Sequence, residues 1–315
     1  MNYRRLGKSG LRVSEIALGA WLTYGGTVQA ARSEAIVKAA VERSVNFIDI
    51  ADIYSCGEAE RVVGRAIKDM QRSDLVISSK LFWPMSDNVN DRGLSRKHIM
   101  ESIDKSLARI GTDYLDIYFC HRFDPDTEME EIVRAMDDLV HQGKVLYWGT
   151  SVWTAAQIEK ACGEAAAWRA YQPYAEQPRY NMIDRHIEID VMDTCRDHGI
   201  GLVVWSPLAQ GLLTGKYNDG LPEGSRGATT EWLKADLNES NLAKIRKLGE
   251  FAKSLDITVS QLALAWVLRR DEISSAIIGA TTVEQLQENV IASSIALDDD
   301  ELTTIDGILA NDPQA

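Results

Sequence analysis

Four ionisable side chains of different types lie at or just after three apolar segments of the sequence. Asp49 follows the apolar part of the first segment and Tyr54 lies five residues further on, Lys80 ends the second, and His121 directly follows the third. Taken singly, such residues are most often helix caps, solvated charges or core side chains. Four types at three consecutive segments are an unusual combination, and together they indicate a catalytic site.

These residue types are suited to acid–base chemistry on a carbonyl group. A tyrosine phenol has a pKa of about 10 and is a poor proton donor at neutral pH. A nearby Lys80 cation is expected to lower the pKa of Tyr54, while the Asp49 carboxylate holds the lysine. His121 is expected to hydrogen-bond a carbonyl oxygen and orient it. The set therefore predicts carbonyl reduction, with the proton from Tyr54 as general acid and the hydride from a nicotinamide.

The segments that carry these residues belong to a regular alternation of short apolar runs and helical patterns. Eight strands are expected, at Glu15–Gly19, Asn46–Ile50, Leu75–Lys80, Tyr114–Cys120, Val145–Ser151, Arg169–Pro173, Gly201–Ser206 and Ser275–Ile278. A helix is expected after each, at Ser33–Arg43, Glu58–Met70, Ser95–Ile110, Met129–Gln142, Thr154–Ala167, Arg185–His198, Val259–Arg270 and Thr282–Ile291.

Strict alternation of strand and helix implies parallel strands joined by crossover helices, and eight such units close a (β/α)₈ TIM barrel. Catalytic groups of such barrels lie at the C-terminal ends of the strands, where the four residues are expected. A doubly wound open sheet is the alternative. It would need a G-x-G-x-x-G turn after the first strand, and the sequence contains none.

Three additions to the barrel are expected. Tyr3–Leu6 and Leu11–Val13 predict an N-terminal β-hairpin, Leu208–Asn238 a long loop after the seventh strand, and Asp298–Leu309 a terminal helix. The sequence has no Pro- or Ser-rich linker, so a single domain over residues 1–315 is expected.

Composition excludes several classes of protein. Lys and Arg number 34 and Asp and Glu 47, a net charge of −13, which disfavours binding to nucleic acid or to an anionic membrane surface. No apolar run approaches the length of a membrane helix. Four cysteines in 315 residues are too sparse for a disulfide framework, and none has the spacing of a metal site. We therefore expect a cytoplasmic protein that binds no metal.

Around the four residues the sequence resembles the aldo-keto reductases, over nearly the whole chain. Residues 46–54 are similar to the first signature of that family, 78–80 to the strand with its catalytic lysine, and 115–121 to the strand leading to its histidine. The resemblance implies a catalytic tetrad of Asp49, Tyr54, Lys80 and His121. The branch with potassium-channel β subunits and their bacterial reductase relatives is the most similar, on residues 19–26, 147–151, 176–177, 205–211, 215–217 and 278–281.

The resemblance also implies a site for NADP(H). Ser151 and Gln177 match residues that hold the nicotinamide carboxamide, and Trp205 matches an aromatic side chain that stacks on the nicotinamide. Residues 206–209, with Lys216 and Arg226, are expected to line the phosphates. The implied contacts are Ala20, Trp21, Asp49, Ser151, Gln177, Trp205, Ser206, Pro207, Leu208, Ala209, Gln210, Lys216, Arg226, Gly279, Thr281, Gln285, Glu288 and Asn289.

The helix after the eighth strand is expected to receive the adenosine end. Thr282 and Gln285 have the spacing of a capping box, and the amides before this helix would bind the 2′-phosphate. Gln285 stands where many members of the family have Arg, so the strength of the preference for NADPH over NADH stays open. Val152 stands where many members have Asn and this branch often has Arg.

The expected substrate is a small carbonyl compound. Its pocket is predicted on loops after the strands, from Trp21, Tyr24, Trp83, Arg122 and Trp153. The aromatic side chains would form an apolar mouth, and Arg122 beside His121 would suit an anionic group. The branch often assembles as homo-oligomers, which the sequence leaves open.

Two other functions stay open at this stage. An NADPH-binding regulatory subunit with little turnover is the first, although His121 argues against it, because some members of that group have lost the histidine. A barrel with unrelated chemistry is the second, and the implied cofactor contacts argue against it. Reduction of aldehydes and ketones to alcohols, or the reverse oxidation, agrees best with a complete tetrad.

Overall fold

The computed structural model spans residues 1–315, and we describe all of them except 22–27, 223–224, 226, 228–232, 234–235 and 314–315. Eight parallel strands close a barrel in the order β10-β3-β4-β5-β6-β7-β8-β9. They are β3 (Ile16–Gly19), β4 (Phe47–Asp49), β5 (Val76–Leu81), β6 (Leu115–Cys120), β7 (Val145–Thr150), β8 (Ala175–Glu176), β9 (Gly201–Trp205) and β10 (Ile273–Ile278). The predicted (β/α)₈ TIM barrel is confirmed.

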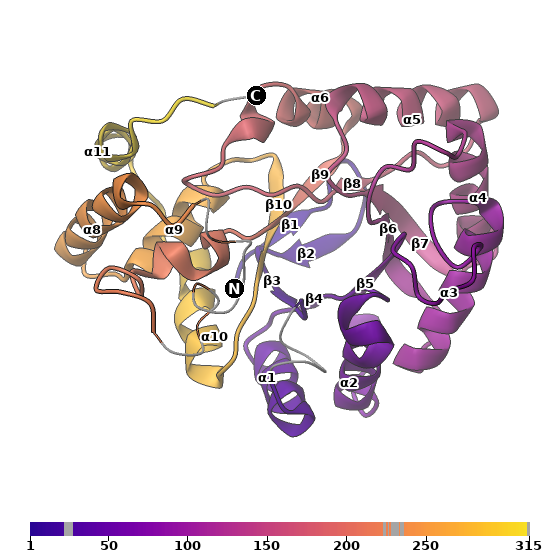
Figure 1. Ribbon diagram of the computed structural model, residues 1–315, viewed down its shortest axis with the longest axis horizontal. Coiled ribbons are helices and arrows are strands. Elements are labelled where there is room, and N and C mark those ends of the chain that lie inside the picture. The colour runs from indigo at the N-terminus through magenta and orange to yellow at the C-terminus, as the bar shows by residue number, and fades with distance from the viewer. Residues whose placement is uncertain (22–27, 223–224, 226, 228–232, 234–235, 314–315) are drawn as a thin grey trace.

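Helices surround the barrel (Figure 1). Those that follow the strands are α1 (Ala30–Glu42), α2 (Glu58–Ile67), α3 (Arg96–Ile110), α4 (Met129–His141), α5 (Ala155–Trp168), α6 (Val191–His198), α9 (Val259–Leu268) and α10 (Val283–Val290). Every residue of β5 and β6 is buried, because one face of each strand packs on these helices and the other fills the barrel.

The predicted N-terminal hairpin is present, formed by β1 (Tyr3–Arg5) and β2 (Arg12–Ser14) in antiparallel pairing. Leu6 and Val13 of this hairpin are fully buried and pack with Phe47, Ile117 and other inward side chains of the barrel. The hairpin therefore closes the N-terminal end of the barrel with apolar side chains and leaves the C-terminal end for the candidate site.

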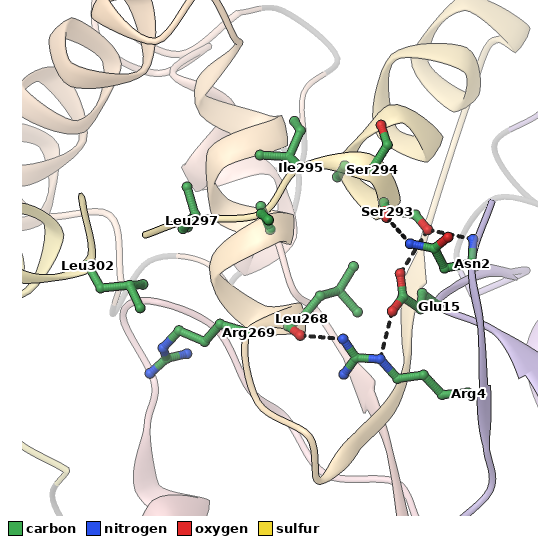
Figure 2. A pocket seen from close by; sticks show the side chains of 13 residues that line it. Asn2, Arg4, Glu15, Leu268, Arg269, Ser293, Ser294, Ile295, Leu297 and Leu302 are labelled. Carbon is green, nitrogen blue, oxygen red and sulfur yellow. Dashed lines mark hydrogen bonds and ion pairs between the residues drawn. The ribbon is translucent and has the colours of Figure 1, made fainter. Parts of the chain in front are cut away.

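A cavity of about 370 Å³ lies at that N-terminal end, between the hairpin, α9, the 3₁₀ turn η6 (Ile291–Ser294) with the segment after it, and α11 (Asp299–Leu309) (Figure 2). Arg4 in its wall binds Glu15 at 2.7 Å and donates to the main-chain oxygen of Leu268 at 2.6 Å. Asn2 and Glu15 both bond to Ser293. These polar groups satisfy one another, so this region fastens the hairpin to the barrel.

The sixth strand differs from the prediction. Arg169–Pro173 was expected there, and the strand is the two-residue β8 instead. Arg169 has a φ of +53° and ends α5, and Pro173 has no N–H to donate to a sheet. The sixth helix also begins later than predicted, at Val191, after a separate 3₁₀ turn over His186–Glu188.

Among the described residues, the helix after the long loop was not predicted. After the loop that follows β9, several of whose residues lie outside the described part, α8 (Glu239–Ser254) begins at Asn238, whose side chain accepts the N–H of Asn241. In Figure 1, α8 and α11 lie outside α9. Among the described residues no single helix is long and apolar enough to cross a membrane, although α8 and α9 together, bent by 91°, reach that length and composition.

Candidate active site

A buried ion pair between Lys80 and Asp49 lies at the C-terminal end of the strands. Lys80 Nζ is 2.6 Å from Asp49 Oδ2 and 2.8 Å from the main-chain oxygen of Ile50. Asp49 lies beside Ser78 in the register of β4 and β5, and Lys80 is two residues further along. Side chains two residues apart share a face of a strand, so the parallel pairing brings both charges together. Ser78 Oγ donates to Asp49 Oδ1 at 2.7 Å.

Tyr54 reaches this pair from a tight turn, η1 (Tyr54–Gly57). Ser55 and Cys56 have φ angles of +51° and +53°, and Gly57 follows at +88°. A Cβ at Gly57 would lie 2.7 Å from Arg109 Cδ, so glycine is needed both for the left-handed backbone and for the close approach. The turn places the Tyr54 ring with its centroid 4.9 Å from Lys80 Nζ.

The predicted lowering of the Tyr54 pKa is wrong in its net direction. Burial raises the pKa of Tyr54 well above its ordinary value, the Asp49 carboxylate raises it further, and Arg122 is the cation that lowers it. The Lys80 ammonium is held by Asp49 and compensates the carboxylate, whose charge would otherwise raise the pKa of the phenol further. Tyr54 is a protonated phenol at neutral pH.

His121 directly follows β6 and faces Tyr54. The two rings meet edge to face, with centroids 5.8 Å apart and an interplanar angle of 78°. Burial, and then the Lys80 and Arg122 cations, hold the pKa of His121 well below its ordinary value. The ring is therefore neutral at pH 7 and has one N–H to donate. The structure brings all four predicted catalytic residues together.

Ser151 and Gln177 lie beside the ion pair. Gln177 Nε2 donates to Asp49 Oδ1 at 2.9 Å, and Ser151 Oγ donates to the main-chain oxygen of Gln177, also at 2.9 Å. Both side chains are buried. Two residues that were predicted to hold a carboxamide are thus fixed in one hydrogen-bonded network with the catalytic pair.

The sequence did not assign a role to Glu176, which the structure buries beneath this network. Glu176 Oε2 accepts from Thr150 Oγ1 at 2.5 Å, and Oε1 accepts the N–H of Trp153 at 3.3 Å. Burial raises the pKa of Glu176 to about 7. The carboxylate holds the loop that carries Ser151.

Val152, in the same loop, has a φ of +59°. This left-handed conformation costs a β-branched residue about 1–2 kcal/mol, whereas Asn adopts it readily. We expect Val152→Asn to raise the free energy of unfolding by about 1 kcal/mol and the Tm by roughly 2–4 °C, measured by calorimetry. Val89→Asn is the control, because Val89 is 78% exposed and has no positive φ. Equal changes in Tm for both variants would contradict the argument.

The segment after β9 has a backbone suited to a phosphate group. Ser206, Ala209 and Gln210 have φ angles of +55°, +46° and +57°, and Gly211 has +98°. Left-handed residues next to right-handed ones turn successive N–H groups toward one concave side, which binds anions. A Cβ at Gly211 would lie 2.7 Å from Lys216 Nζ, so the Lys216 ammonium lies against this segment. The residues present therefore fit the pyrophosphate of a dinucleotide.

The start of α10 has a different cap from the one predicted. Thr282 Oγ1 accepts the N–H of Gln285, as in a capping box. The Gln285 side chain, however, accepts from Thr281, from its N–H at 2.9 Å and from its Oγ1 at 3.0 Å. Gly279, Thr281 and Gln285 are exposed, Glu288 is half-buried and Asn289 is buried.

Aromatic side chains gather near the tetrad. Trp205, at the end of β9, and Trp21 meet edge to face with centroids 6.1 Å apart. Trp83, which is 37% exposed, has its centroid 6.3 Å from that of the His121 ring. Trp153 is buried against Phe123 in the core. Of the other predicted residues, Ala20, Pro207 and Leu208 lie on the same loops, whereas Tyr24 and Arg226 are outside the described residues.

Asp52 is a second buried acid that the sequence did not single out. It accepts the N–H of Ile53 at 2.6 Å and lies 3.4 Å from Ser102 Oγ, and in this way it fixes the turn that carries Tyr54. Burial, and then the Glu60 carboxylate, raise the pKa of Asp52 to about 8. In the described part of the chain no three His, Cys, Asp or Glu side chains are placed to hold a metal ion.

The pKa of Asp52 predicts a dependence of stability on pH. Its folded pKa of about 8 lies above its ordinary 3.8, so its contribution is complete below pH 3.8 and is lost as the pH rises through 8. Asp52→Asn cannot ionise. We therefore expect the stability of Asp52→Asn relative to wild type to increase from pH 6 to pH 8. The difference in free energy of unfolding should grow by up to about 1 kcal/mol per pH unit, and thermal unfolding at each pH measures it as a difference in Tm. The exposed Asp69→Asn should show no such trend, and a parallel trend would contradict the assignment.

Comparison with known proteins agrees with this fold. A sequence profile described as "Aldo/keto reductase family" matches residues 15–310. An Arabidopsis thaliana protein named "Probable voltage-gated potassium channel subunit beta" is 44% identical over 302 residues, which cover 94% of this chain and 92% of that protein. An Oryza sativa subsp. japonica protein of the same name is 42% identical over 302 residues, with the same coverage.

The fold, the site and these matches define a barrel of the oxidoreductase class. The chain belongs to the aldo/keto reductase family.

Proposed function

We propose that this chain is an NADP(H)-dependent reductase that converts aldehydes and ketones to alcohols. One observation carries the proposal. A protonated Tyr54 phenol and a neutral His121 imidazole face each other, with ring centroids 5.8 Å apart, above a buried Lys80–Asp49 pair. Two neutral donors so placed can address one carbonyl oxygen.

The residues for the cofactor follow the barrel rim. Ser151 and Gln177 would hold the carboxamide and Trp205 the face of the nicotinamide, residues 206–210 with Lys216 the pyrophosphate, and the start of α10 the adenosine end. NADPH held by these residues would supply the hydride that the carbonyl carbon receives. The site thus has acceptors and donors for both ends of a dinucleotide.

The protein residues orient the substrate carbonyl and transfer the proton to it. His121 donates its N–H to the carbonyl oxygen in a hydrogen bond, and Tyr54 transfers its phenolic proton to the same oxygen. The C=O double bond becomes a C–O single bond, with a new C–H bond from the hydride and a new O–H bond from the Tyr54 proton. Tyr54 then recovers a proton from water. Lys80 neutralises Asp49, which would otherwise oppose formation of the phenolate. Lys80 and Asp49 are both buried, so water screens their ion pair little.

A regulatory subunit that binds NADP(H) with little turnover is the second candidate. It is favoured by the names of the relatives, which are potassium channel subunits. Both candidate functions include binding of NADP(H). They differ in whether bound NADPH reduces a carbonyl substrate.

A single-turnover experiment separates them. Protein loaded with stoichiometric NADPH is mixed with 4-nitrobenzaldehyde, and the loss of nicotinamide absorbance is followed together with the alcohol product. A reductase oxidises the bound NADPH and forms one equivalent of alcohol. NADPH that binds but stays reduced would contradict the reductase and favour the regulatory subunit. Absence of NADPH binding would contradict both.

A further inference from the structure

Arg122, the residue after His121, has an unusual environment for an arginine. It is half-buried, and burial lowers its pKa. Its Nη1 donates to the main-chain oxygen of His121 at 2.5 Å, and its Cζ lies 5.8 Å from the centroid of the Trp83 ring. The guanidinium is thus held beside the catalytic histidine, on the side of the exposed tryptophan.

Other shielded arginines of this protein contact carboxylates. Arg72 Nη2 lies 2.7 Å from Asp116, and Arg185 Nη2 lies 2.8 Å from Glu188. Arg122 forms no such ion pair with any residue that the structure describes. Removing a cation from water without pairing it to a carboxylate costs free energy. An unpaired, half-buried arginine at a site is therefore explained best by an anionic ligand that binds to it.

The charged groups around Arg122 do not neutralise its positive charge. Lys80 and Asp49 neutralise each other at 2.6 Å. The Glu176 carboxylate acts on Arg122 through its charge, but its oxygens are bound to Thr150 and Trp153, and its pKa of about 7 leaves it partly protonated at neutral pH. A positive charge therefore remains at the rim, next to the two donors that address the carbonyl oxygen.

We propose that the site takes carbonyl substrates that carry an anionic group, with the carboxylate bound by Arg122 and the apolar body against Trp83. This inference rests on the proposed reductase function. A guanidinium has five N–H donors in a planar fork that matches a carboxylate. One donor is engaged by His121, so the others are free to bind the substrate. The anion then orients the carbonyl toward Tyr54 and His121.

The test compares substrates that differ in charge and little in shape. 3- and 4-Carboxybenzaldehyde are assayed against 3- and 4-formylbenzamide with NADPH, in wild type, Arg122→Gln and Arg122→Lys. We expect wild type to favour an acid over its amide in kcat/KM. Arg122→Gln should lower that acid-to-amide ratio roughly 10- to 100-fold, and Arg122→Lys should retain part of it. NADPH binding, followed by tryptophan fluorescence, reports that each variant is folded.

Arg92→Gln is the matched control, because Arg92 is exposed on the loop after β5 and loses the same charge. Its ratio should equal that of wild type. If Arg122→Gln lowers the rates for acid and amide equally, Arg122 acts on the catalytic residues and the proposal is overturned, while the reductase function stands.

A binding measurement covers the case in which no aldehyde is reduced. Benzoate and benzamide are titrated into the protein with NADP⁺ by calorimetry. Benzoate binding that Arg122→Gln abolishes supports the anion site even where the reductase function fails. No preference for benzoate over benzamide in wild type overturns it.

Discussion

Tyr54→Phe is expected to lower kcat for aldehyde reduction by roughly 10²- to 10⁴-fold, the range that a general acid contributes. The phenol is protonated at neutral pH because burial and the Asp49 carboxylate raise its pKa, and it faces His121 across the reacting site. In the proposed mechanism the Tyr54 hydroxyl carries the proton that is transferred. Its removal therefore leaves the developing alkoxide without a proton donor.

The Tyr54→Phe variant keeps the aromatic ring and loses only the phenolic hydroxyl. The ring still packs against the core and meets His121 edge to face. NADPH affinity, measured by tryptophan fluorescence, should change less than threefold, in contrast with the loss in kcat, because the hydroxyl contacts no predicted cofactor residue. Tyr171→Phe, a removal of an exposed hydroxyl, is the control with expected full activity. Turnover of Tyr54→Phe within a factor of three of wild type would remove Tyr54 from the proposed mechanism.

Lys80→Met is expected to lower the free energy of unfolding by about 3–5 kcal/mol and to abolish measurable reduction. The methionine fills much of the same space but leaves the Asp49 carboxylate buried without its counterion, and breaking one side of a buried pair has this effect. Asp49 is also beside Tyr54, and without Lys80 its charge raises the pKa of the phenol further. Chemical denaturation and the aldehyde assay measure the two effects separately.

The double variant Asp49→Asn with Lys80→Met separates stability from catalysis. With both charges removed, no unpaired ion is left in the core, and most of the lost stability should return. Ser78 and Gln177 both donate to Asp49 Oδ1, so the amide oxygen of the asparagine can accept both hydrogen bonds, and its NH₂ group takes the place of Oδ2, which bound Lys80. Reduction should remain impaired. A double variant as unstable as Lys80→Met would show that the cost lies in packing and not in the unpaired charge.

Much of the candidate site could be predicted from residue types and spacing. Asp49 and Lys80 meet because two apolar strands run parallel and side chains alternate along each, and both facts follow from local pattern. The eight strand–helix units likewise predicted the barrel, since each apolar strand must be covered by the helix that follows. The sixth strand was misplaced because β8 has two residues and no β-branched run, so its strand pairing comes from its neighbours β7 and β9.

By itself, the sequence determined the order of the barrel units, the set of four catalytic candidates and their common end of the barrel. The tertiary structure decided how charge is distributed there. It bound Lys80 to Asp49 and raised the pKa of Tyr54, and it left Arg122 without a carboxylate among the described residues. The reason is physical: spacing fixes which residues share a face, but burial and the distances between groups from β4, β5 and β6 set their protonation.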